Sequence, residues 1–132
     1  MNTKVKIMIA VLILSLVLLN IAFASQIVPC ADPKFSRATA SLTTNKTVSF
    51  SCMTIREKEK ISIISCWLQK KTNNKWSWAG SLEAPTNIAT NTTLYVAVMD
   101  YSDEIGSGTY RVGFIINADG HAITRYSNER TY

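Results

Sequence analysis

The chain has 132 residues, 47% of them hydrophobic, and a formal net charge of +5. This length suits one ordinary domain and excludes an assembly of several. Basic and acidic residues are interleaved, so the charge is too small and too dispersed to indicate nucleic-acid binding.

Residues 1–24 have the pattern of a secretory signal peptide. Lys4 and Lys6 form a short basic head, an apolar run follows at 7–19, and the segment ends in small residues at Ala24. The run is shorter than the roughly 20 residues that cross a bilayer. We therefore expect cleavage near Ala24 and a secreted bacterial protein without a membrane anchor. An uncleaved anchor is the alternative.

The rest of the chain predicts an all-β fold. Short segments rich in β-branched and aromatic residues are separated by turn residues, and none has helical periodicity. After a lead-in over 25–37, strands are expected within the domain 38–132, at 38–43, 48–52, 61–70, 76–81, 93–99, 110–116 and from 122 onward.

The turns between these strands have their own signals. Asparagines at 73–74 tolerate positive φ and Asp119-Gly120 favours a tight hairpin, so both are predicted turns and Gly120 has a structural role. The charged run 56–60 is expected to be a solvated loop. In the third strand, Ile64 is expected to share the core face with the cysteine and leucine that follow it.

About seven antiparallel strands in some 100 residues favour an immunoglobulin-like β-sandwich, with a barrel as the alternative. Tyr110 begins the sixth strand, where a tyrosine corner bonds back to nearby backbone. Cys52 and Trp67 match the immunoglobulin cysteine and tryptophan in position. Val112, however, lies where the partner cysteine belongs, so any disulfide must be formed differently.

The chain has three cysteines, and export permits disulfides. A bridge between Cys52 and Cys66 is preferred, because both are expected to face the core from adjacent strands. In the alternative, Cys30 pairs with Cys52 and Cys66 is a small buried hydrophobe. A leftover Cys30 gives a possible dimer through an intermolecular bond.

Two segments carry a family resemblance. Leu68–Trp76 (LQKKTNNKW) and Gly108–Val112 (GTYRV), followed by Asp119-Gly120, resemble motifs of a group of short secreted Firmicutes proteins. The opening strand from Ala38 to Leu42 is similar as well. The resemblance implies export, a sandwich fold and structural roles for Trp76 as a core tryptophan and for Tyr110. It implies no activity.

Catalytic signatures are missing from the sequence. It holds no nucleophile elbow, zinc-protease motif or phosphate-binding loop, and His121, its single histidine, follows a turn. Asp100, Asp103 and Glu104 share one loop whose spacing matches no calcium motif. We therefore expect no metal, no cofactor and no enzyme activity.

Trp67 is the most informative side chain, because alternation places it outward between Ser65 and Gln69. An outward indole can stack on sugar rings or anchor a protein partner, with Gln69 and Arg111 beside it. A one-residue slip would return it to the core, where Trp76 and Trp78 are expected to pack. The sequence thus predicts a secreted, non-enzymatic binding or adhesion module for cell-envelope carbohydrate or protein. A secreted antimicrobial-like effector is the alternative, and an enzyme ranks last.

Overall fold

The computed structural model describes residues 34–132 and shows an all-β fold without helices in that part of the chain. The predicted signal peptide, Cys30 and residues 25–33 of the predicted lead-in lie outside the described residues. Between residues 34 and 132, no helix is long and apolar enough to cross a membrane.

Seven antiparallel strands make up the fold, which confirms the all-β prediction. The strands are β1 (Phe35–Leu42), β2 (Thr47–Thr72), β3 (Lys75–Leu82), β4 (Ala89–Asp100), β5 (Thr109–Ala118), β6 (His121–Tyr126) and β7 (Arg130–Thr131). The strands expected at 48–52 and 61–70 are joined in one long β2, and the last expected strand is divided into β6 and β7. β1 begins three residues before the expected domain start.

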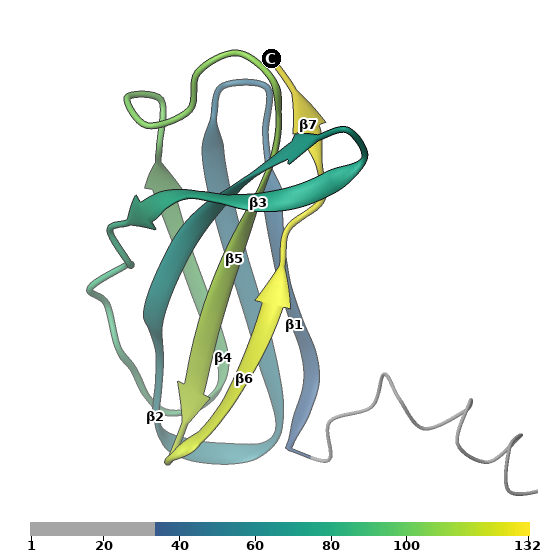
Figure 1. The fold of residues 1–132 in the computed structure, drawn as a ribbon. Helices are drawn as coiled ribbons and strands as arrows, with labels where there is room; N and C mark the ends of the chain where they lie inside the picture. The colour runs from purple at the N-terminus through teal and green to yellow at the C-terminus, as the bar shows by residue number, and fades with distance from the viewer. Residues whose placement is uncertain (1–33) are drawn as a thin grey trace, which may run out of the picture. The chain divides into compact units, whose positions relative to one another are not determined.

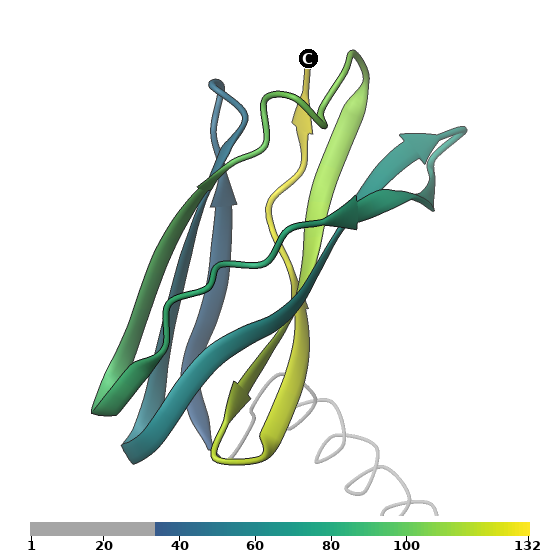
Figure 2. The same ribbon diagram turned by 90° about the vertical axis from the view of Figure 1, so that its left-hand side faces the viewer.

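The strands form two layers, and β2 passes from one to the other (Figures 1 and 2). In the first layer, residues 47–53 of β2 pair with β1 and β4. In the second layer, residues 61–71 of β2 pair with β5, residues 66–72 also pair with β3, and β5 pairs in turn with β6 and β7. The more specific expectation, that these layers have the topology of an immunoglobulin-like sandwich, stays a prediction.

The charged run 56–60 is part of β2, so its prediction as a loop is wrong. The register between β2 and β4 shifts between Met53 and Lys58, and pairing then resumes with Lys58 opposite Thr92. The run is largely exposed. β2 therefore turns from one layer to the other through a stretch that contributes no core side chains, while its backbone stays extended and pairs with β4 again from Lys58.

A second irregularity in β2 reverses the expected position of Ile64. The register with β5 shifts between Ile63 and Ser65, which adds one residue to the alternation. Ile63 and Cys66 are consequently buried, whereas Ile64 is 54% exposed. The prediction that Ile64 faces the core is wrong for this reason.

The core lies between the two layers and is built from inward residues of both. Phe50 of the first layer meets Phe114 of the second edge-on, with ring centres 5.2 Å apart and planes at 74°. Tyr95 and Tyr101 are also fully buried. The Tyr101 hydroxyl donates to the carbonyl oxygen of Glu83 at 2.7 Å, so its polar end is satisfied.

The predicted turns and tyrosine corner are present. Asn73 and Asn74 have φ of 53° and 60°, and Asp119 and Gly120 have φ of 50° and 84°. These left-handed conformations suit asparagine, aspartate and glycine. The buried Tyr110 donates its hydroxyl to the carbonyl of Ser107 at 3.2 Å, as a tyrosine corner requires.

Candidate functional site

The outward surface of the second layer carries a group of aromatic and polar side chains that we call the aromatic face. Side chains of alternate residues in a strand share one side of a sheet, and directly paired residues share it too. Strand pairing therefore places these positions together. The aromatic face consists of Trp67, Gln69, Trp76, Trp78, Arg111 and Tyr126.

Trp67 lies flat against the backbone of β5. Its direct partner in β5 is Gly113, and a Cβ added to Gly113 would be 2.3 Å from Cε2 of the indole. On β6, Tyr126 meets the same indole edge-on, with ring centres 6.1 Å apart and planes at 87°. The missing side chain at Gly113 thus creates the space that Trp67 occupies, and the ring is half-buried.

Arg111 links the remaining parts of the face. Its Nε donates to Oε1 of Gln69 at 2.7 Å. Its guanidinium carbon lies 4.4 Å from the centre of the Trp76 ring and 4.1 Å from that of Tyr126. These distances are short enough for cation–π attraction. Residues from four strands therefore hold one another in a fixed arrangement.

Cationic side chains border the face at the β2–β3 hairpin. Nζ of Lys71 lies 5.5 Å from the centre of the Trp76 ring and forms an ion pair of 3.2 Å with Glu129. Lys75 is exposed on the neighbouring turn. An exposed pair such as Lys71–Glu129 contributes little to stability. Its effect is to keep the lysine beside the tryptophan.

The predicted core positions of Trp76 and Trp78 are wrong. Trp76 pairs with Lys71 and Trp78 with Gln69, so both tryptophans share the outward side of those β2 residues. Trp78 is 66% exposed and Trp76 is half-buried. Hydrophobicity alone favours the core, but strand register determines the side of the sheet.

Trp67, Gln69 and Arg111 do come together as one surface, and Trp67 does face outward. Sequence reasoning missed Tyr126, which is 44% exposed. The hairpin at Asp119-Gly120 could have located it. A two-residue turn pairs Ala118 with His121, and counting back along both strands brings Tyr126 opposite Gly113.

The predicted disulfide between Cys52 and Cys66 is absent, and both cysteines are buried free thiols. The two cysteines belong to different layers. Cys52 pairs with Ala38 and Tyr95 in the first, and Cys66 pairs with Leu82 and Phe114 in the second, so a shared inward direction does not by itself bring the two sulfurs to bonding distance. Burial raises the pKa of each thiol from 9.0 to about 11. Neither is therefore an activated nucleophile, because the thiolate is the reactive form.

The loop that carries Asp100, Asp103 and Glu104 is a turn in which an aspartate bonds to nearby backbone. Asp100 accepts a hydrogen bond of 2.9 Å from the Ser102 backbone, and this bond lowers the pKa of the carboxyl group. Among residues 34–132, no group of three or more histidine, cysteine, aspartate or glutamate side chains is arranged to hold a metal ion.

Comparisons with protein-family models, with curated proteins and with solved structures gave no match for this chain.

Proposed function

We propose that this protein is a secreted, non-enzymatic binding module that holds its partner through the aromatic face. The observation that supports this most is the contact of Arg111 with both Trp76 and Tyr126, next to the outward Trp67. Four strands contribute to this surface. Packing of the core does not require large, mutually contacting side chains on the solvent side of the sheet.

The composition of the face is that of an interaction surface. Tryptophan, tyrosine and arginine are the residues most enriched where single side chains dominate binding energy. Trp78 and Tyr126 keep 66% and 44% of their surface exposed. Because Trp67 and Arg111 already hold the Tyr126 ring, binding through this ring would cost little further side-chain entropy.

The charge of the face favours a partner with acidic groups. Arg111 uses Nε for Gln69, whereas a guanidinium has five donors in its plane. The two terminal nitrogens are suited to grip a carboxylate in bidentate fashion. Lys71 and Lys75 at the edge of the face would add attraction at longer range.

Between the partner classes expected from the sequence, a protein surface is favoured. A sheet presents an extended surface, and tryptophan, tyrosine and arginine together suit such interfaces. Cell-envelope carbohydrate is the second candidate. The specific observation in its favour is that Trp67 lies flat on Gly113, an orientation that suits stacking on a sugar ring.

Secretion rests on the signal-peptide pattern of residues 1–24. The resemblance to secreted Firmicutes proteins supports it. The strand order supports an immunoglobulin-like sandwich, since β1, β2 and β4 form one layer and β3, β2, β5 and β6 the other. A dimer through Cys30 is a further part of the proposal, and the aromatic face is proposed to bind neither nucleic acid nor membrane.

The test is binding of the purified protein to glycan arrays and to isolated cell-envelope proteins. Trp78→Ala should weaken binding about tenfold or more, as loss of an interface tryptophan does, without changing stability much. Val96→Ala on the first layer is the matched control, since Val96 is also exposed, at 58%. Equal losses for both variants would contradict a role for the aromatic face. Leakage of dye from vesicles would instead support the effector alternative.

A further inference from the structure

A second surface feature lies away from the aromatic face, where β1 begins and β2 turns between the layers. It is a cavity of about 270 Å³ lined by Lys34, Ile55, Arg56 and Lys58. Three of these four residues are cationic, and none of the lining residues within 34–132 is acidic. We call it the cationic cavity.

The backbone around the cavity is fixed by hydrogen bonds. The Ile55 amide donates to the carbonyl of Lys34 at 3.2 Å, which holds the start of β1 against β2. The Thr54 hydroxyl donates to the Arg56 carbonyl at 2.7 Å, and Thr54 is buried. These hydrogen bonds fix the backbone from which the side chains of Lys34 and Arg56 extend.

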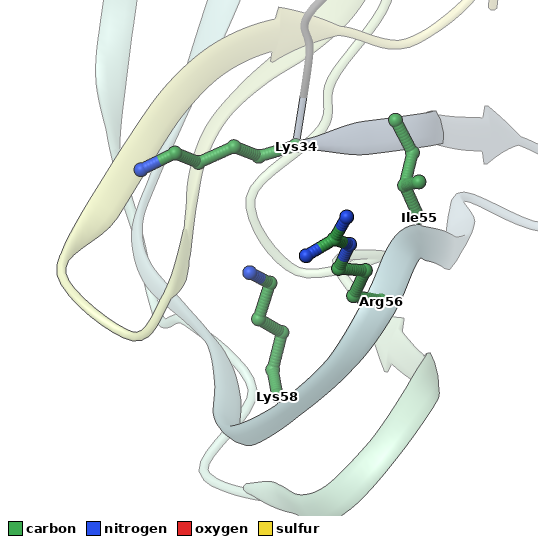
Figure 3. Close-up of a pocket in the computed structure, with 4 residues that line it drawn as sticks. All are labelled: Lys34, Ile55, Arg56 and Lys58. Atoms are coloured by element: carbon green, nitrogen blue, oxygen red, sulfur yellow. The ribbon is translucent and has the colours of Figure 1, made fainter.

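Local geometry explains why the cations converge. Arg56 and Lys58 are two residues apart in β2, so they point to the same side, while Glu57 between them points to the other. In Figure 3 the Arg56 and Lys58 side chains rise from β2 toward one space, and Lys34 borders that space from the start of β1.

Two of the cations have no carboxylate partner in the described part of the chain. Within residues 34–132, neither Arg56 nor Lys58 forms an ion pair with a carboxylate. The charge of Lys58 contributes to the lowered pKa of Asp119. The Asp119 carboxylate, however, already accepts bonds of 3.0 and 2.9 Å from the amides of Glu59 and Lys60.

We propose that the cationic cavity binds a phosphate group, either as free phosphate or as the headgroup of an anionic lipid. Arginine offers paired donors that match phosphate oxygens, and lysine adds a compact positive charge. Ile55, 57% exposed, provides an apolar rim beside the cations. Such a rim suits the carbon part of a phosphate ester. This site is independent of the aromatic face and goes beyond the proposed binding function.

The experiment is a titration of the purified protein, followed by the backbone NMR signals of residues 34 and 55–58. Inorganic phosphate is the first probe, with chloride at equal ionic strength as the reference. Vesicles of phosphatidylglycerol, compared with phosphatidylcholine vesicles by sedimentation, are the second. Lys58→Gln is compared with Lys75→Gln, which removes the same charge from an exposed site on the β2–β3 turn.

We expect phosphate to shift the signals of the cavity. Lys58→Gln and Arg56→Gln should each weaken binding about tenfold, as expected for loss of a hydrogen bond to a charged group, and Lys75→Gln should not. Binding to phosphatidylglycerol that needs the same residues would support a lipid source, and response to phosphate alone would support a soluble one. Absence of response to both probes, or an equal effect of Lys75→Gln, would overturn the proposal.

Discussion

The two layers of the fold share one core but differ on their outward faces. In the first layer, outward Val96 and Val98 of β4 are 58% and 67% exposed, and each lies opposite a serine of β2, at Ser51 and Ser49. Leu94 and its β2 partner Met53, 45% and 39% exposed, continue the same outward side, so this face is an apolar row beside serines. In the second layer, the outward positions hold the aromatic face, where ring, cation–π and hydrogen-bond contacts join Trp67, Gln69, Trp76, Arg111 and Tyr126.

The difference shows which part of the sequence the fold constrains. Inward positions of both layers must be apolar because they meet across the core, as Phe50 and Phe114 do. Outward positions have no such partner layer. The arrangement of Arg111 between Trp76 and Tyr126 is therefore not required by packing between the layers, and this is the premise of the proposed function.

The largest expected effect tests the common core. Phe114→Ala removes half of the contact between Phe50 and Phe114 and should lower the free energy of unfolding by about 3–5 kcal/mol. Phe50→Ala, from the other layer, should cost a similar amount. Because the rings touch, the double variant should cost less than the two single changes added together. Urea denaturation measures all three. Full additivity would contradict the contact across the layers.

The buried thiols provide a second test, one from each layer. Burial raises the pKa of Cys52 and Cys66 from 9.0 to about 11. Between pH 9 and pH 11, the two thiols therefore stay protonated in the folded protein but lose their protons in the unfolded chain. The stabilising contribution is complete below pH 9 and should decline as pH rises from 9 to 11. Denaturation at a series of pH values measures the decline.

The single changes Cys52→Ala and Cys66→Ala serve as controls for this decline. Each should make the loss of stability above pH 9 shallower, and by a similar amount, because each removes one thiol with a raised pKa. The core tyrosines Tyr95 and Tyr101, whose pKa values burial also raises, should keep a residual slope at higher pH. An unchanged slope in both variants would contradict the assignment to the thiols.

The next effect concerns only the second layer. Gly113→Ala would place a Cβ 2.3–2.5 Å from the indole of Trp67, so the ring would have to leave the sheet and its contact with Tyr126. We expect a loss of about 1–3 kcal/mol, the usual cost of overpacking. A shift of tryptophan fluorescence should accompany it. In Gly113→Ala/Trp67→Ala the added methyl group would fit, and adding it to Trp67→Ala should cost little. A full cost there would contradict the steric explanation.

Alternation and turn residues were enough to predict much of this fold. The pattern from Tyr110 to Ile116 predicted β5, because a strand with one buried face must alternate, and Asp119-Gly120 predicted its hairpin. The charged run 56–60 could not be recognised as strand, since it has no apolar alternate residues. The bulge at Ile64 also has no sequence signal of its own.

The candidate site was predicted only in part, for a related reason. Trp67, Gln69 and Arg111 could be placed outward from alternation within single strands. The outward position of Trp78 depends on the register between β2 and β3, which alternation within one strand does not reveal. The bridge between Cys52 and Cys66 failed because two inward residues need not be within bonding distance.

The smallest expected effects are those of two substitutions, one on the outward face of each layer. Arg111→Lys keeps the charge but loses the planar group that contacts two rings and the Nε bond to Gln69. Since exposed cation–π contacts contribute about 0.5–1 kcal/mol, we expect a loss near 1 kcal/mol in urea denaturation. Val96→Thr on the first layer keeps the β-branched shape at an exposed site without cation–π contacts, and its effect should stay within about 0.5 kcal/mol. Equal effects would mean that the aromatic face is no more connected than its counterpart. A larger loss for Arg111→Lys would show that the second layer gains stability from contacts among outward side chains, while Trp78 beside them remains 66% exposed.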